Sequence, residues 1–286
     1  MTALKPTIAA RARQHSLAQR PWGLYLAVVF VGVLIVASVS PQLLAHGDPS
    51  ALDYPATLQG PSVAHWFGTD ESGRDLFTRI VYGARISLPI GLGAALVGVV
   101  TALLLGTTSA LGPRWIATAI DRLIEIMFSF PALLLALLLI AITGPSAISE
   151  IFAVGLGTAP GYARMIRGQI RSAKSAAYVE AATALGHSRG RIICAHILPN
   201  ALRPLVAVFA LSIGQSIVWA SSLSFLGLGV APPSPEWGAL LDAGRSYVTV
   251  AGWLLIIPGL VIVAVALAAT TIGRHIQSYL ERGDSA

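Results

Sequence analysis

Long apolar runs constrain this chain more than any other feature of its sequence. They cover residues 22–44 and about 86–111, 123–143, 204–224 and 250–272. Each is long enough to cross a hydrocarbon layer about 30 Å thick as a helix. A helix is expected because lipid offers no hydrogen-bond partner to backbone groups. We therefore predict an all-α, polytopic membrane protein.

A sixth run, at about residues 145–163, is weaker than the others. It is interrupted by Gly155, Gly157, Pro160 and Gly161. Counting it gives six transmembrane helices, which puts both termini on one side of the membrane. Only 11% of the residues are charged, against about 25% in soluble domains. The aqueous parts must therefore be small.

The distribution of Lys and Arg orients the chain. Residues 1–21 are basic, and the run that follows is longer than the apolar part of a cleaved signal peptide, so we favour an uncleaved first span. With the N-terminus inside, all but four of the 19 Lys and Arg residues lie in inner segments. The positive-inside rule then predicts that both termini are cytoplasmic. The net charge of +6 therefore reflects topology, and no basic, aromatic-rich module suggests nucleic-acid binding.

The predicted organisation is a cytoplasmic N-terminal segment (1–21), a first transmembrane helix (22–44), an extracytoplasmic loop (45–82), a core of five transmembrane helices (83–273) and a cytoplasmic tail (274–286). The core contains a cytoplasmic loop at 164–203 and an extracytoplasmic loop at 225–249. Pro131 predicts a kink in the third span.

The cytoplasmic loop contains a basic segment, YVEAATALGHSRGRIICAHILPN, at residues 178–200. Strong helix formers follow Tyr178, and Glu180 stands near the helix start, where a carboxylate suits the helix dipole. Gly186 permits a tight turn, and we expect Pro199 to stop a second short helix because it lacks an N–H. The residues alone leave two interpretations open: a docking element for another protein, or an amphipathic hairpin on anionic lipid.

The spacing E-A-A-x-x-x-G followed by H-I-L-P resembles the EAA loop of permease subunits in ABC importers. The matching positions are Glu180, Ala181, Ala182, Gly186, Leu198 and Pro199, and His196 makes H-I-L-P-N similar to the dipeptide/oligopeptide branch. Other stretches between about residues 66 and 260 resemble the same branch: FGTDESGRD, YGARISLPIG, SFP, YARMIRGQ, LSFLGLG and PEWGALL. The resemblance is to its second, C-type permease.

The resemblance implies a type I importer permease fold with a cytoplasmic coupling helix, in the plasma (inner) membrane of a bacterium. Its implied partners are a homologous second permease, two P-loop ATPase subunits or one fused tandem ATPase, and an extracytoplasmic substrate-binding protein. The residues that would couple to the ATPase are Glu180, Ala181, Ala182, Gly186, His196, Leu198 and Pro199. Alternating access is the implied mechanism.

The resemblance leaves the substrate open. Di- or oligopeptides are the default of the branch, whereas nickel complexes, glutathione and haem use related permeases. Ala159 and Ala220 depart from the branch pattern, as does the C-terminal tail GRHIQSYLERG.

The sequence contains no catalytic or metal-binding motif. There is no G-x-x-x-x-G-K-[ST], and neither Lys5 nor Lys174 follows a Gly. Hydrolysis of ATP with Mg²⁺ must therefore come from partner ATPases. The absence of G-x-S-x-G and H-E-x-x-H argues against an intramembrane enzyme. A single cysteine, Cys194, and histidines without ligand spacing predict no metal site.

One face of the fifth span collects polar residues at helical spacing: Ser212, Gln215, Ser216, Trp219 and Ser222. Polar groups in lipid are unfavourable, so this face should meet protein or a watery path. This face either lines a translocation pathway or packs against other helices, and its spacing is compatible with both interpretations. Two rival classes are an ion-driven secondary transporter, which needs intramembrane ionisable groups and often a repeat, and a non-transporting membrane scaffold.

Overall fold

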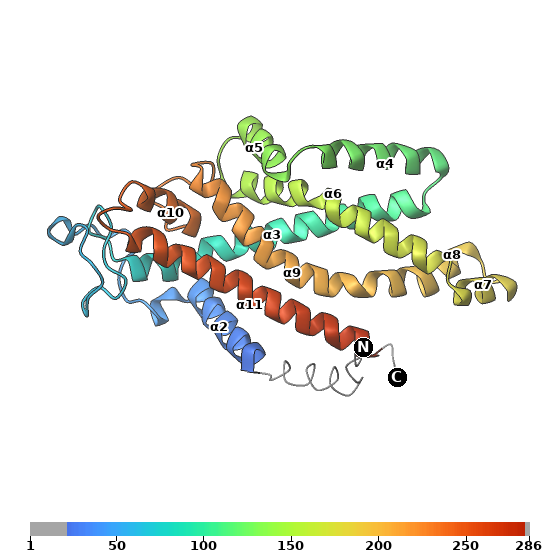
Figure 1. The fold of residues 1–286 in the computed structure, drawn as a ribbon, viewed down its shortest axis with the longest axis horizontal. Helices are drawn as coiled ribbons and strands as arrows, with labels where there is room; N and C mark the ends of the chain where they lie inside the picture. Colours follow the sequence, from blue (N-terminus) through green and yellow to red (C-terminus); the bar gives the residue numbers. More distant parts are fainter. Residues whose placement is uncertain (1–21, 284–286) are drawn as a thin grey trace, which may run out of the picture.

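The computed structural model describes residues 22–283 of the 286-residue chain. The predicted cytoplasmic segment 1–21 and the last three residues of the tail lie outside the described residues. Figure 1 shows an elongated helical bundle, with irregular loops at one end and two short helices at the other.

The described helices are α2 (Trp22–Val39), α3 (Leu76–Leu111), α4 (Arg114–Ser129), α5 (Ala132–Thr143), α6 (Ala147–Lys174), α7 (Ala177–Ala184), α8 (Arg189–Ile192), α9 (Leu198–Phe225), α10 (Trp237–Arg245) and α11 (Trp253–Gly283). Three short turns of helix are η1 (Pro41–Leu43), η2 (Tyr54–Ala56) and the π-helical η3 (Ile193–Ile197). Within the described range, β-structure is limited to one isolated bridge, between Thr69 and Asp75. The predicted all-α class is confirmed.

Judged by length and composition, fewer helices qualify as membrane spans than the six predicted. Four described stretches are long and apolar enough to cross a membrane: Trp22–Val39, Leu76–Leu111, Arg189–Phe225 and Trp253–Leu280. The α4–α5 pair adds a fifth if it counts as one span. Helix α6 does not qualify, because Glu150, Tyr162, Arg164 and other polar residues lower its hydropathy. The six-span count is therefore not confirmed.

Several helix ends differ from their predicted positions. Helix α3 begins at Leu76 rather than near residue 86, because Asp75 caps it. The Asp75 Oδ2 accepts from the backbone N–H and the hydroxyl of Thr78, both at 2.8 Å, and such a cap satisfies a donor that has no partner within the helix. The extracytoplasmic loop predicted at 45–82 thus ends in helix.

Three other predicted loops or tails are partly helical. Helix α6 extends into the predicted cytoplasmic loop as far as Lys174, α10 lies inside the loop predicted at 225–249, and α11 continues to Gly283. The predicted kink at Pro131 is a full break, since α4 and α5 meet at 94°. Phe130 is extended, with φ −87° and ψ 136°, as expected for a residue before proline.

The prediction that Pro199 stops a helix is wrong. Pro199 lies in the first turn of α9, which continues to Phe225. Because the preceding Leu198 N–H already donates to the Ile193 carbonyl, the missing N–H of Pro199 removes one bond without ending the helix. The π-turn η3 precedes it, and the Asn200 side chain donates to the His196 carbonyl at 2.8 Å. Helical structure therefore runs without interruption from Arg189 to Phe225.

An ion cluster ties the loop before α3 to the loop before α10. The Asp70 Oδ2 accepts from Arg74 Nε at 2.7 Å and from Arg79 Nη1 at 3.0 Å. Arg79 also donates to the Pro233 carbonyl at 3.3 Å. Trp237, which is fully buried, donates from its indole to the Ile80 carbonyl at 3.0 Å. Both loops are therefore fixed to the first turns of α3.

Helix α3 is the centre of the bundle, and α6 and α9 pack along it (Figure 1). Small residues permit the close approach. A Cβ added at Gly91 would overlap the Ile217 side chain of α9, and one added at Gly98 would lie 3.1 Å from the Gly155 carbonyl of α6. Close backbone contact of this kind is the main source of helix association within membranes.

Replacing Gly91 with Leu is expected to destabilise the fold. The new side chain would have to displace Ile217, and overpacking of this kind costs about 1–3 kcal/mol. The change should lower the unfolding temperature of the detergent-purified protein, measured by fluorescence-detected size-exclusion after heating. Gly32→Leu on α2 is the matched control, because nothing lies within 4 Å of its added Cβ. Equal unfolding temperatures for the two variants would contradict the packing argument.

Candidate functional site

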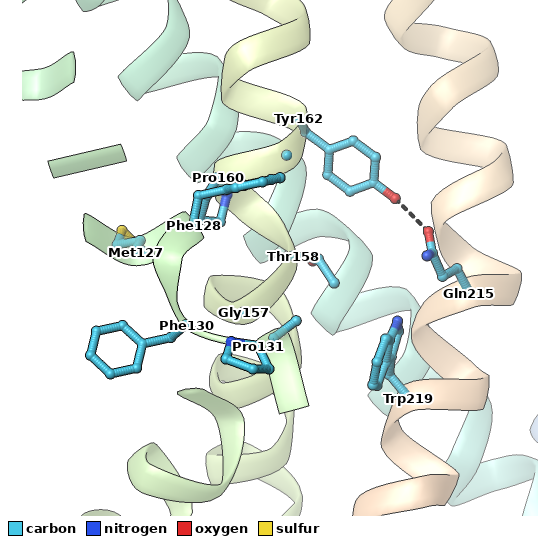
Figure 2. A pocket seen from close by; sticks show the side chains of 12 residues that line it. Met127, Phe128, Phe130, Pro131, Gly157, Thr158, Pro160, Tyr162, Gln215 and Trp219 are labelled. Atoms are coloured by element: carbon cyan, nitrogen blue, oxygen red, sulfur yellow. Dashed lines mark hydrogen bonds between the residues drawn. The ribbon is translucent and has the colours of Figure 1, made fainter. Parts of the chain in front are cut away.

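A cavity of about 410 Å³ lies between the α4–α5 break, α6 and α9 (Figure 2). We call it the Gln215 cavity. It is lined by Met127, Phe128, Phe130, Pro131, Ala132, Gly157, Thr158, Pro160, Gly161, Tyr162, Gln215 and Trp219. These side chains come from segments far apart in the sequence, so only the fold brings them together.

The cavity exists because of how the α4–α5 break meets α6. Pro131 turns the chain sharply and lies beside Gly157 of α6, whereas the Phe130 ring points away from that helix (Figure 2). The Gly157–Gly161 stripe of α6 allows the α4–α5 break to approach closely. A Cβ added at Gly157 would lie 3.1 Å from the Ala132 carbonyl, and one added at Gly161 would lie 3.9 Å from the Phe128 ring.

A hydrogen bond joins two walls of the cavity. The Tyr162 hydroxyl on α6 donates to the Gln215 Oε1 on α9 at 3.0 Å (Figure 2). Trp219 lies one turn further along α9, on the same side as Gln215. The Thr158 hydroxyl donates to the Val154 carbonyl of its own helix at 3.0 Å. The polar groups of the cavity are therefore neutral hydrogen-bonding groups set among aromatic rings and glycines.

The five polar residues predicted on one face of α9 do not all reach this cavity. Gln215 and Trp219 line it, whereas Ser212 and Ser216 are buried between helices. Ser222 lies at a separate apolar hollow with Phe225 and residues of α10 and α11, and it donates to its own helix at the Val218 carbonyl. The face predicted from spacing is thus divided among three environments.

Sequence reasoning missed the residues that the α4–α5 break and α6 contribute. Phe128, Phe130 and Tyr162 line the cavity, but each stands in a segment that reads as ordinary apolar or interfacial helix. The Gly157-x-x-x-Gly161 spacing was the available signal, since it marks a face of α6 that another element approaches closely.

A second candidate region is the α7–α8 hairpin, by which we mean α7, α8 and η3 (residues 177–197). The turn predicted at Gly186 is present, with φ +79°. The Gly186 N–H donates to the Thr183 carbonyl at 3.0 Å, and the His187 N–H donates to the Ala182 carbonyl at 3.1 Å. This is the Schellman arrangement, in which glycine takes the left-handed position.

The residues expected to couple to an ATPase lie on and beside this hairpin. Glu180, in the first turn of α7, is exposed, as are Ala181 and Gly186, whereas Ala182 is buried. The His196 ring stacks on that of His187, with centroids 5.7 Å apart. Leu198 and Pro199 begin α9 instead of ending the hairpin. An open hollow of about 800 Å³ is bounded by Glu180, Thr183, His187, Arg189 and the ends of α3 and α6.

The hairpin is attached to the bundle by an apolar core and by a nearby ion cluster. Val179, Ala182, Ile192 and Ile197 of the hairpin pack with buried residues of α4, α6 and α9. At the same end, Asp121 of α4 accepts from Arg167 of α6 at 2.5 Å and from the Ser109 hydroxyl of α3. The hairpin is therefore carried on fixed helix ends.

In the described part of the chain, no group of three or more His, Cys, Asp and Glu side chains gathers where it could hold a metal ion. Cys194 is exposed on the hairpin. Ala159 and Ala220, the two departures from the branch pattern, are both buried against neighbouring helices.

Comparison with known proteins shows which protein family this chain resembles. The family described as binding-protein-dependent transport system inner membrane component matches residues 74–283. The chain is 38% identical over 254 residues to the dipeptide transport system permease protein DppC of Alkalihalophilus pseudofirmus, covering 89% of this chain and 83% of that protein. It is 38% identical over 254 residues to the glutathione transport system permease protein GsiD of Pectobacterium atrosepticum, covering 88% and 84%.

A third relative is the probable D,D-dipeptide transport system permease protein DdpC of Escherichia coli K12, at 41% identity over 256 residues, covering 89% and 85%. Among solved structures, an amino acid ABC transporter with histidines aligns with TM-score 0.57 and 19% identity, over 72% of this chain and 94% of that one. The inward-facing MetNI methionine ABC transporter aligns with TM-score 0.52 and 20% identity, over 70% and 96%. These two similarities establish the fold alone.

Gly186→Val is expected to loosen the α7–α8 hairpin. A β-branched residue at positive φ is strained by about 1–2 kcal/mol, whereas Gly186→Asn should be tolerated because Asn adopts this conformation. Limited proteolysis of the purified protein should cut the Val variant faster within residues 177–197. Gly190→Val is the control, since Gly190 has no positive φ and its added Cβ meets nothing within 4 Å. Faster cleavage of both Val variants alike would contradict the strain argument.

Proposed function

The chain belongs to the family of binding-protein-dependent transport system inner membrane components, and from this premise we propose that it forms half of the translocation pathway of an importer for di- or oligopeptides. It is the permease component of an ABC importer in the inner membrane, and it is not an enzyme. The proposal concerns its cargo, its topology and the residues that act.

We propose six spans: α2, α3, the bent α4–α5 pair, α6, α9 and α11, with both termini in the cytoplasm. We count α6 as a span in spite of its low hydropathy because α3, α5, α4 and α9 pack around it. Its Glu150 is fully buried, and the Ser224 hydroxyl of α9 donates to it at 3.3 Å. Polar residues are tolerated within a membrane where protein covers them.

The α7–α8 hairpin is the proposed contact with a cytoplasmic ATPase. Its exposed Glu180 and Ala181 and the hollow of about 800 Å³ beside them offer a surface outside the bundle. ATP and Mg²⁺ would be bound and hydrolysed by two partner ATPase subunits or one fused tandem ATPase. A homologous second permease would complete the pathway, and an extracytoplasmic binding protein would deliver the cargo to the loops that the Asp70 cluster holds.

One observation carries the mechanism. The helical stretch from Arg189 to Phe225 begins in the hairpin and continues through α9 to Gln215 and Trp219 at the cavity. Motion imposed on the hairpin by ATP-driven closure of the ATPases would therefore move one wall of the cavity directly. Alternating access follows if that movement opens the cavity outward, and hydrolysis restores the inward-facing state.

The Gln215 cavity is the proposed segment of the pathway on this subunit. Its neutral donors and acceptors, Thr158, Tyr162 and Gln215, suit amide groups. Peptides and glutathione both contain amides, and relatives named for each resemble this chain about equally. We propose peptides as the cargo, with glutathione as the alternative.

Glu180→Lys is expected to weaken ATPase binding. Reversing a charge at the proposed contact should reduce co-purification of the ATPases with the detergent-solubilised permease pair about tenfold or more. Asp48→Lys is the matched control, because it makes the same charge change on an exposed loop residue at the opposite end of the bundle. Wild-type recovery of the ATPases and wild-type uptake in Glu180→Lys would contradict the proposed contact.

Gln215→Leu is expected to slow uptake without loss of assembly. The change removes the hydrogen bond with Tyr162 and one polar group of the cavity, and a hydrogen bond contributes about 1 kcal/mol, or about fivefold in rate. Peptide uptake into proteoliposomes containing the complete importer measures the effect. The control is Ser222→Ala, which lies outside the cavity. Normal uptake by Gln215→Leu would instead favour a packing role.

A further inference from the structure

The Gln215 cavity carries no charged side chain among its twelve lining residues. A peptide and glutathione are zwitterionic or anionic, and each carries at least one free carboxylate. A carboxylate that leaves water needs a donor or a cation to replace its hydration. A cation in contact with the lining would therefore recognise the free carboxylate of the cargo.

Arg164 of α6 stands at the edge of the cavity. It follows Gly157 by seven residues and Gly161 by three, so all three lie on one face of α6. Its guanidinium carbon lies 4.0 Å from the centroid of the Phe128 ring, and Phe128 lines the cavity. Because α6 runs towards Lys174 and the hairpin, Arg164 lies on the hairpin side of Tyr162.

Arg164 differs from three arginines near it on α4 and α6, Arg122, Arg167 and Arg171. Arg167 and Arg171 both face Asp121, at 2.5 Å and 3.9 Å. Arg122 pairs with Glu125 at 2.6 Å. For Arg164, no carboxylate oxygen of residues 22–280 lies within 4.0 Å of the guanidinium. Its one described partner is an aromatic ring.

A guanidinium stacked on a ring remains able to bind an anion. The cation–π contact uses the flat face of the group. The five N–H donors lie in its plane and form a fork that matches a carboxylate in a bidentate pair. The Phe128 ring thus holds the cation at the cavity without occupying its donors.

We propose that Arg164 binds the free carboxylate of the cargo at the inner mouth of the Gln215 cavity, and that it makes this permease selective for carboxylate-bearing substrates. The inference rests on the proposed function, since it assumes that cargo passes through this cavity. Arg164 is exposed, so a carboxylate bound there can exchange with water and be released to the cytoplasm. A pathway needs such binding to be reversible.

The first test measures uptake by the complete importer, with both permeases, the ATPases and the binding protein, in phosphatidylcholine vesicles. The probes are alanyl-alanine, its C-terminal amide and glutathione. Arg164→Gln should lower uptake of the free-acid probes about tenfold, as expected for loss of one charge-assisted pair, and should leave amide uptake close to wild type. Arg164→Lys should recover part of the loss. Arg122→Gln, which removes a cation away from the cavity, should change neither.

The outcomes separate the alternatives. Equal loss for acid and amide would overturn the proposal and indicate that Arg164 contacts the second permease. An effect that appears only in vesicles containing anionic lipid would overturn it in favour of a headgroup contact. If Arg164→Gln transports the acids at the wild-type rate, the inference fails while the proposed function stands. If the wild-type importer shows no ATP-dependent uptake of either free-acid probe, the proposed function and the inference fail together.

The second test restores the charge chemically and does not depend on the amide probe. Cys194 is the only cysteine of the chain, so Cys194→Ser provides a background for a single Arg164→Cys change. Treatment with 2-aminoethyl methanethiosulfonate, which attaches an ammonium group, should restore at least half of the lost uptake of the free acid. Methyl methanethiosulfonate, which attaches a neutral group, should not. Equal rescue by both reagents, or by neither, would contradict a role for the charge.

Discussion

The close contact of α3 with α6 and α9 is the constraint on which the other features of this fold depend. Helices in lipid gain little from the hydrophobic effect, so they associate where their backbones can approach. Gly91, Gly98 and Gly106 of α3 provide that approach, each facing a side chain or carbonyl of α6 or α9. Glu150 of α6 is fully buried within the packed bundle.

The positions of the two candidate sites follow from the packing of α6 and α9 on α3. With α6 and α9 held on α3, the α4–α5 break at Pro131 leaves an open space between them, and the Gln215 cavity forms there. The same α9 continues through the π-turn η3 into the α7–α8 hairpin. The π-turn η3 and Pro199 fall beside the hairpin core of Val179, Ile192 and Ile197. The cavity and the hairpin are thus two ends of one continuous element.

The sequence predicts local features of this molecule well and long-range ones poorly. Apolar runs identify α2, α3, α9 and α11, and Gly186 identifies its turn, because each depends on a short stretch of chain. Asp75 and Thr78 form a helix start that hydropathy ignores, since a cap contributes nothing to an apolar count. Hydropathy also cannot distinguish a helix that faces lipid from one that neighbouring helices cover. It therefore does not identify α6 as a span. The division of Ser212, Gln215 and Ser222 among three environments depends on which helix lies opposite each residue.

Charge is distributed in this chain so that its middle is neutral. The Asp70–Arg79 cluster fixes the loops at one end of α3, and the Asp121–Arg167 pair fixes α4 to α6 near the other. The first cluster is neutral, since Asp70 and Glu71 face Arg74 and Arg79. Between the two clusters the Gln215 cavity offers neutral hydrogen bonds, which hold amides weakly and exchange readily with water. Strong electrostatic binding there would trap the cargo, because a pathway requires each contact to be given up again. In the proposed pathway, a single exposed cation at one mouth, held on the Phe128 ring, would impose a preference for one end of the cargo without creating such a trap.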